Sequence, residues 1–172
     1  MTSNKRRTIE GWIDKASNQL QAARDFSKLP TQYSEAIQAA QECVELSVKS
    51  MLSLLDVTFP HSHGWEQDKK QFAAIAEQIQ KKRLVDKLTA QYLNHIVNLP
   101  RLLLLVNVWA QFYTTAKYGF EAGYIASAKD LFKREDAELA ILHAQECYQA
   151  ASQLRYLSED KLATLLSYEE TG

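Results

Sequence analysis

Residues that interrupt helices are scarce in this chain of 172 residues, which holds only five glycines and three prolines. That scarcity excludes a β fold rich in tight turns and favours long helices. An excess of charge of either sign is also missing, since the formal net charge is −1. The chain is therefore not expected to bind nucleic acid through its overall charge, although a local basic patch is compatible with this balance.

Cysteines and long apolar runs are equally sparse. The two cysteines, Cys43 and Cys147, occupy apolar helical positions without metal-ligand spacing, which predicts buried free thiols. The strongest apolar run, at residues 102–106, is far shorter than the ~18–20 residues that span a bilayer. No apolar stretch follows the basic residues 5–7, so we expect no signal peptide, no membrane partner and a cytoplasmic location.

What the sequence does contain is helical periodicity. Apolar residues make up 46% of the chain and recur at helical spacing in almost every segment, without a convincing strand-like alternation. The pattern predicts an all-α fold, an antiparallel up-and-down helical bundle of about five main helices. We expect a single domain over residues 1–172, with a core at about 8–157, then a short tail helix and a frayed C-terminus. Helical segments are expected at residues 8–27, 31–55, 65–79, 84–98, 100–118 and 127–155.

The expected helix at residues 100–118 is apolar nearly all round its first half, from Leu102 to Trp109. A helix of this kind must be covered on more than one side. Two arrangements satisfy that requirement: a central core helix, or a contact with a second copy of the chain. The sequence does not choose between them.

Residues 33–65 carry a more specific pattern. A helix rich in small residues places Glu45 four positions before Lys49, and Pro60 then leads to His63. This order resembles the second helix and the following loop of HEPN domains, where a histidine opens the next helix. Gly64 departs from the resemblance, since many members of that family have an aspartate there.

Two further segments fit the same family. The helix that begins near Trp12 resembles the opening helix of HEPN domains, with its tryptophan and alanine-rich face. Lys117-Tyr118-Gly119 lies where many members carry arginine, tyrosine and proline, so the cation and the ring are kept while the proline is lost. In all, the resemblance covers about residues 8–157. It implies a helical bundle that commonly forms homodimers and often acts beside a minimal nucleotidyltransferase.

Many members of the HEPN family are ribonucleases, frequently toxins, with an arginine followed by four to six residues and a histidine. Such a histidine can move the 2′-hydroxyl proton while the arginine stabilises phosphate charge. No arginine in this chain precedes a histidine at that spacing. The closest ordered pair is Arg134 and His143, which a helix places on opposite faces. We therefore expect a family member that lacks the usual ribonuclease motif.

Four residues are candidates for binding a nucleotide or RNA: Lys49, His63, Lys117 and Tyr118. Lys117 and Tyr118 offer a cation and a stacking ring, and Lys49 could face a phosphate. Structural interpretations stay open, since Glu45 and Lys49 have the spacing of a helix ion pair and Lys117 suits a helix end. His63 could equally cap or pack a helix. The histidines of this turn are too few for a metal site, and we expect no metal and no cofactor.

The leading functional hypothesis is a non-catalytic, nucleotide- or RNA-associated binding module. It would act as a homodimer with a groove that either holds a nucleotide or RNA or docks a nucleotidyltransferase partner, in a context like that of a toxin–antitoxin pair. One alternative is a metal-independent ribonuclease rebuilt from His63 with Lys117 or Arg101. Another is a structural helical adaptor that docks a foreign protein through residues 102–109.

Overall fold

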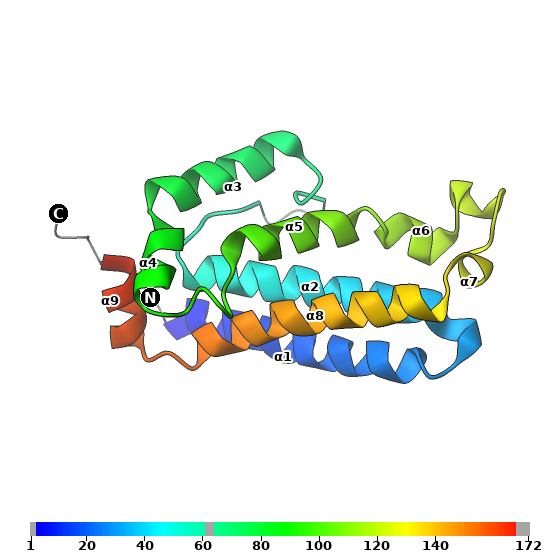
Figure 1. The fold of residues 1–172 in the computed structure, drawn as a ribbon, viewed down its shortest axis with the longest axis horizontal. Coiled ribbons are helices and arrows are strands. Elements are labelled where there is room, and N and C mark those ends of the chain that lie inside the picture. Colours follow the sequence, from blue (N-terminus) through cyan, green and yellow to red (C-terminus); the bar gives the residue numbers. More distant parts are fainter. Residues whose placement is uncertain (1–2, 61–63, 168–172) are drawn as a thin grey trace.

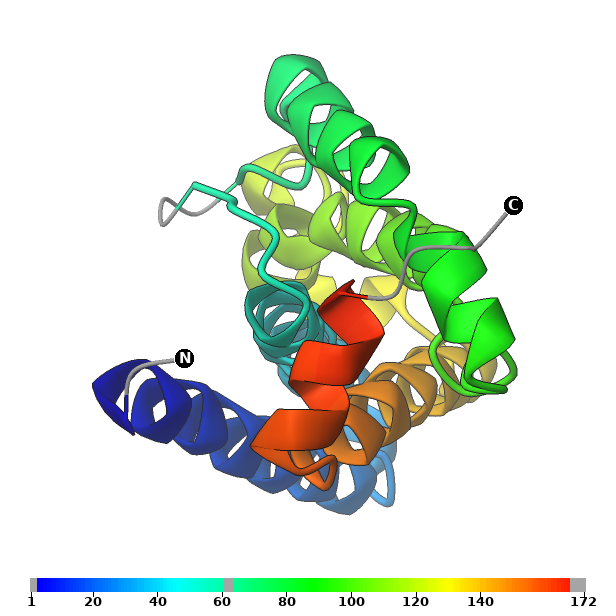
Figure 2. The same cartoon turned by 90° about the vertical axis from the view of Figure 1, so that its left-hand side faces the viewer.

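Three long helices form the frame of the molecule in the computed structural model, which describes residues 3–60 and 64–167 (Figure 1). They are α1 (Ser3–Phe26), α2 (Tyr33–Leu54) and α8 (Arg134–Arg155). The central one is α2, since it makes the most extensive contacts with both α1 and α8. The end-on view of Figure 2 shows the second layer of helices stacked on this frame.

Small residues line the contact between α2 and α8. Both helices contain the sequence Ala-Gln-Glu-Cys, at residues 40–43 and 144–147. The alanines at the start of both stretches are fully buried, and the Sγ atom of Cys43 lies 3.6 Å from the carbonyl oxygen of Ala144. Both cysteines are buried and free, as the sequence predicts, and burial raises the pKa of the Cys43 thiol to about 12.

The second layer consists of α3 (Lys69–Lys81), α4 (Leu84–Ala90), α5 (Leu99–Ala110) and α6 (Tyr113–Tyr118). Helix α3 begins later than the sequence pattern predicts, because Asp68 caps it by accepting from the backbone N–H groups of Lys70 and Gln71. Asn98 caps α5 in the same way, and Pro100 lies in its first turn as expected. The late start of α3 leaves residues 64–68 as a turn.

The prediction of one continuous helix over residues 100–118 is wrong. Helix α5 ends at Ala110 with hydrogen bonds of i to i−3 type, such as that from the N–H of Phe112 to the carbonyl of Trp109. The side chain of Gln67 donates to the Ala110 carbonyl at 2.6 Å. This bond satisfies a carbonyl that the end of the helix leaves open. The chain then starts α6 in a new direction.

Helix α5 is mainly a core helix. Its apolar side chains are buried on several sides, whereas Leu104 remains 56% exposed. The chain ends with α7 (Ala128–Leu131), α8 and α9 (Glu159–Ser167). The frayed C-terminus expected at residues 169–172 lies outside the described residues.

The described residues contain no β-strand, only an isolated bridge between Phe120 and Ala126, and the predicted all-α bundle is confirmed. Within the same residues, we find no helix with the length and apolar character needed to cross a membrane.

Candidate functional site

A groove with a volume of about 830 Å³ runs beside α2. Its floor consists of polar side chains spaced three or four residues apart on α2, which therefore share one face of the helix. Helix α1 forms one wall and α5 and α6 form the other. Phe59 and the turn at residues 64–67 lie at one end. The floor residues are Glu35, Gln38, Glu42, Glu45 and Lys49.

Lys49 is held in a nearly buried ion pair with Glu45. Its Nζ atom lies 2.5 Å from the Glu45 carboxylate, and the two side chains are 10% and 13% exposed. Gln41 donates to the other oxygen of the same carboxylate at 3.3 Å. Since a buried charge is costly unless it is paired, this geometry favours the ion-pair interpretation of Lys49. A phosphate would have to compete with Glu45 for this cation.

Glu66 lies in the turn at residues 64–67, at one end of the groove, and is only 2% exposed. Its Oε1 atom has no hydrogen-bond partner among the described residues. Burial raises the pKa of the Glu66 carboxyl above its ordinary value, and the negative charge of Glu45 adds to this effect. Backbone N–H groups of Glu66 and Gly64 and the Lys49 ammonium oppose the shift. Within the described part of the chain, one oxygen of this buried carboxyl, Oε1, therefore accepts no hydrogen bond.

The backbone around Glu66 is fixed to α5. The side chain of Asn107 donates to the Glu66 carbonyl at 2.5 Å, close to the bond from Gln67 to Ala110. Trp65 is fully buried, and its ring lies 5.8 Å from that of Phe59. These contacts explain how a short turn holds a carboxylate in a buried position.

The other end of the groove carries a cation between aromatic rings. The Nζ atom of Lys117 lies 3.3 Å from the Tyr113 hydroxyl, and 5.5 Å and 5.2 Å from the ring centroids of Tyr113 and Tyr118. The hydrogen bonds with Tyr113 and then Tyr118 raise the pKa of Lys117. Gln38 fixes α6 beside α2 by donating to the Ala116 carbonyl at 3.0 Å. The structure therefore brings Lys117 and Tyr118 together, although Tyr118 lies outside the groove lining.

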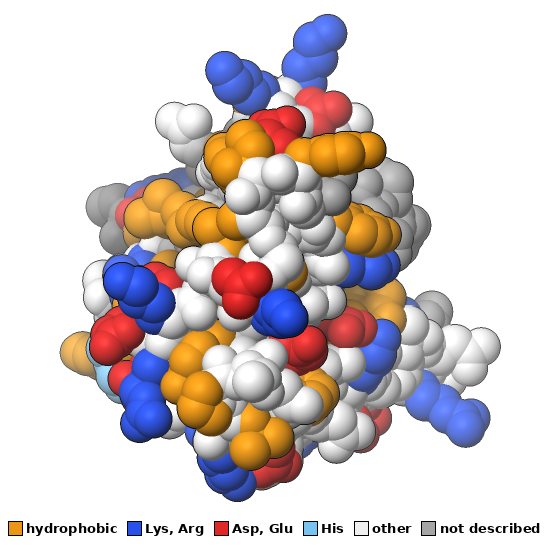
Figure 3. Space-filling model, turned by 90° about the vertical axis from the view of Figure 1, so that its right-hand side faces the viewer, with side chains coloured by type: hydrophobic (Ala, Val, Ile, Leu, Met, Phe, Trp, Pro, Cys, Tyr) orange, Lys and Arg blue, Asp and Glu red, His pale blue; other side chains and the backbone are white. Residues whose placement is uncertain are grey.

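The surface around this end is mixed in character. Figure 3 shows basic, acidic and hydrophobic side chains interspersed over the end formed by α6, α7 and the loops between them. Several aromatic side chains there are exposed, Tyr124 and Tyr118 among them. Exposed rings beside a cation can stack with unpaired bases.

An ion pair and aromatic contacts connect α1 to the rest of the groove. The Nζ atom of Lys15 lies 2.5 Å from the carboxylate of Glu42 on the floor. The ring of Trp12 lies 6.5 Å from that of Phe59. Planar apolar groups are thus available near the end where Glu66 lies.

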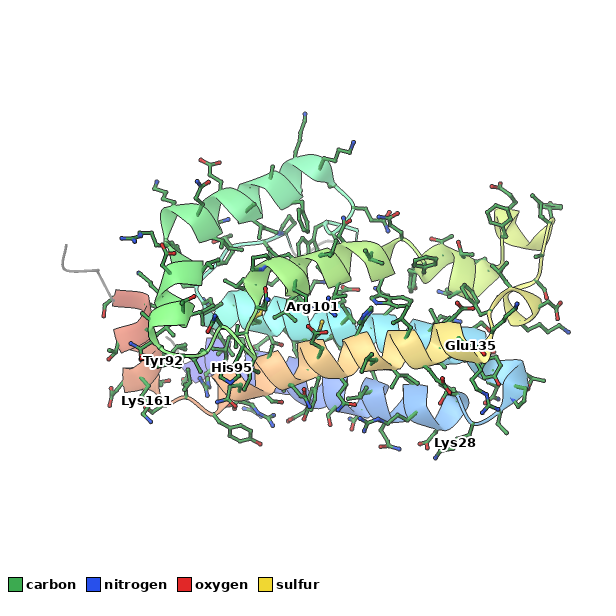
Figure 4. The ribbon with its side chains drawn as sticks, in the orientation of Figure 1. Lys28, Tyr92, His95, Arg101, Glu135 and Lys161 are labelled. Atoms are coloured by element: carbon green, nitrogen blue, oxygen red, sulfur yellow. The ribbon has the colours of Figure 1, made fainter. Side chains whose placement is uncertain are left out.

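Arg101 does not line this groove. It forms a two-point ion pair with Glu146 of α8, at 2.5 and 2.9 Å, on the face shown in Figure 4. Nearby, Trp109 donates to Nδ1 of His143 at 3.1 Å. Burial lowers the pKa of His143, and Arg101 lowers it further, while Glu146 opposes this shift. Arg101 and His143 thus belong to one cluster on α5 and α8, a pairing that the sequence analysis did not predict.

His63, a candidate in both functional hypotheses, lies outside the described residues. Of the candidate site, the structure places Lys49 and Lys117 along one groove and adds Glu66 and Tyr113. Sequence reasoning missed Glu66 as a site residue, because its burial depends on the turn before α3 rather than on a helical pattern. No group of three or more histidine, cysteine or acidic side chains that could hold a metal ion occurs within residues 3–60 and 64–167.

Comparison with known families supports the resemblance described above. A family model with the description HEPN domain matches residues 9–153. Comparison with curated proteins gave no match, and comparison with solved structures gave none.

Proposed function

We propose that this chain, which belongs to the HEPN domain family, binds a nucleotide or single-stranded RNA in the groove beside α2. The observation that carries the proposal is the polarity of the groove. Lys117 provides a cation next to tyrosine rings at one end, and Glu66 provides a buried acceptor at the other. A phosphate and a base are the groups that suit these two ends.

Binding, rather than catalysis, is the function that we infer. The Arg-x4–6-His spacing of the family's ribonucleases is missing from the sequence. Lys49 is paired with Glu45, and Arg101 is paired with Glu146, so both cations already have anionic partners within the chain. Within residues 3–60 and 64–167, Lys117 contacts tyrosine side chains rather than a carboxylate, which supports it as the contact for a phosphate.

Replacing Lys117 tests this proposal. We expect Lys117→Ala to weaken binding of a fluorescein-labelled single-stranded RNA, measured by anisotropy, by about tenfold, since one phosphate contact and its stacking neighbour are lost. The RNA should be recovered uncleaved from the wild-type titration without metal. Lys161→Ala, an equivalent change on the exposed side of α9, is the control and should bind as the wild type does. Equal binding by both variants would remove Lys117 from the proposal.

We also propose a homodimer formed through the exposed face of α5 and α8. Two large apolar side chains on these helices are exposed to solvent, Leu104 at 56% and Leu142 at 60%. The Arg101–Glu146 ion pair joins the two helices. Exposed apolar patches of this kind mark contact surfaces, and a two-fold copy would cover the same patch on both chains.

The solution mass measured by light scattering tests the dimer. We expect two chains for the wild type and one for Leu142→Glu, because a buried carboxylate would be left unpaired at the interface. Leu142 is exposed in the single chain, so the variant should fold normally, as circular dichroism would show. A wild-type mass of one chain would contradict the proposal. The same measurement with an added nucleotidyltransferase would detect that partner, which the family resemblance supports.

A further inference from the structure

Exposed aromatic side chains continue the surface beyond the Lys117 end of the groove. The ring of Tyr118 lies 5.2 Å from the Lys117 ammonium but does not line the groove. Phe120 and Tyr124 follow in the next turn and are exposed as well, Tyr124 to 94%. Because these rings bury little of their surface in the single chain, their faces are available to a ligand.

The turn that carries Phe120 and Tyr124, residues 119–126, has a fixed backbone. The N–H group of Phe120 donates to the Ala126 carbonyl at 3.0 Å, which forms the isolated β-bridge. Gly119 permits this close approach with a φ of +87°, since a Cβ atom there would overlap the Ala126 carbonyl oxygen. A ligand that stacks on a ring of a fixed turn loses little of its binding energy to ordering the protein.

Lys117 lies at the junction between the groove and these rings. It lines the groove, and its ammonium also lies beside the ring of Tyr118. The groove volume of about 830 Å³ is in the range of a site for one small ligand. A phosphate that joins two nucleotides at Lys117 would place one nucleotide in the groove and its neighbour beside Tyr118. A free nucleotide would leave the rings beyond Lys117 without a ligand.

The charge of this end favours stacking over attraction of a long phosphate backbone. Exposed basic residues here, such as Lys129 and Lys133, alternate with exposed acidic ones. The acidic residues include Glu121, Asp130 and Glu135, and Figure 3 shows both signs interspersed with hydrophobic side chains. A strand held mainly by its phosphates needs a basic track, whereas stacking of a base on an aromatic ring needs no net charge. The surface therefore suits a strand with unpaired bases.

We propose that the ligand is single-stranded RNA rather than a free nucleotide, and that bases beyond the nucleotide in the groove stack on Phe120 and Tyr124; this inference rests on the proposed nucleotide- or RNA-binding function. The phosphate at Lys117 is then the link between the groove and the turn at residues 119–126. Every base has an aromatic face, so this part of the site selects the length of the strand and not its sequence. Each base that stacks should add about tenfold in affinity.

Calorimetric titrations with AMP and with the RNA tetranucleotide AAAA test the proposal. We expect the wild type to bind AAAA about tenfold or more tightly than AMP. Phe120→Ala and Tyr124→Ala should each reduce this gain and leave the binding of AMP unchanged, whereas Tyr124→Phe retains a ring and should retain the gain. The Tyr124 variants should fold normally, since the side chain is almost fully exposed. Tyr92→Ala is the control, because Tyr92 is 83% exposed at the opposite end of the molecule (Figure 4), and it should bind as the wild type does.

The outcomes separate this inference from the proposed function. Equal binding of AMP and AAAA, with both weakened by Lys117→Ala, would overturn the assignment of RNA and leave the groove as a site for a free nucleotide. The role of the rings would be overturned by a gain that survives both alanine variants, or by one that is lost between about 50 and 200 mM salt, since phosphate contacts would then provide it. A change in solution mass without a change in RNA affinity would assign the rings to a contact with a second copy instead. If neither ligand binds, the proposed function itself fails.

Discussion

Replacing Lys49 by methionine should lower the free energy of unfolding by about 3–5 kcal/mol, the largest effect that we expect from a single change in the groove. The reason is that Glu45 would remain nearly buried without its cation. Methionine keeps most of the volume and apolar stem of lysine, so little of the loss would come from packing. Urea unfolding monitored by circular dichroism measures the effect.

A double-mutant cycle shows whether the loss comes from the ion pair. Glu45→Gln combined with Lys49→Met removes both charges, and we expect it to recover most of the stability lost in the Lys49 variant. Lys161→Met is the control at an exposed position and should change stability by less than about 0.5 kcal/mol. A loss of under about 1 kcal/mol for Lys49→Met would mean that the pair behaves like an exposed one. That result would favour the phosphate-binding interpretation of Lys49.

Helical periodicity was enough to predict the class of fold. The long helices α1, α2 and α8 have buried stripes at the positions where the apolar spacing places them. The repeated Ala-Gln-Glu-Cys lies on the face of small residues that α2 and α8 share. These features are local in sequence, since a helix repeats every 3.6 residues and its buried face can be read directly.

The breaks between helices were harder to predict, because they depend on contacts between distant residues. The end of α5 at Ala110 is accompanied by a hydrogen bond from Gln67, 43 residues earlier. No proline or glycine marks this position, and residues 100–118 read as one helix in the sequence. The same side-chain contact fixes the turn that positions Glu66. This long-range contact thus accompanies both the break after α5 and the turn that holds Glu66. The expected helices at 84–98 and 127–155 are also wrong in extent, since α4 ends at Ala90 and the latter is divided into α7 and α8.

The candidate site could be predicted only in part for the same reason. Glu45 and Lys49 are four apart on one helix, and their ion pair followed from that spacing. Lys117 and Tyr118 are neighbours in sequence, but the second ring at Lys117 comes from Tyr113 on the preceding turn of α6. That these groups face α2 across a groove depends on how α5 and α6 pack. The spacing of residues within one helix carries no information on that packing.

Glu66→Gln should stabilise the protein above neutral pH and leave it unchanged at acid pH. Burial raises the folded-state pKa of Glu66, whereas the unfolded carboxyl titrates near its ordinary value of 4.5. Between these two pKa values the folded protein holds a proton that the unfolded chain has released. The free energy of unfolding therefore falls as pH rises through this window. Glutamine does not titrate, so the variant does not experience this loss.

The expected gain at pH 8 is the free energy by which the raised pKa of Glu66 destabilises the folded protein, because glutamine has no charge to bury. Thermal unfolding of the wild type and the variant at pH 4 and at pH 8 measures it, with Glu77→Gln as the exposed control. A gain of equal size at both pH values would show that the effect arises from packing rather than from ionisation of the carboxyl. If Glu66→Gln stabilises the free protein at pH 8 and also weakens ligand binding in the groove, Glu66 is destabilising without ligand and contributes to binding. That combination is expected of a binding residue, because a carboxylate kept for structure would stabilise the free protein.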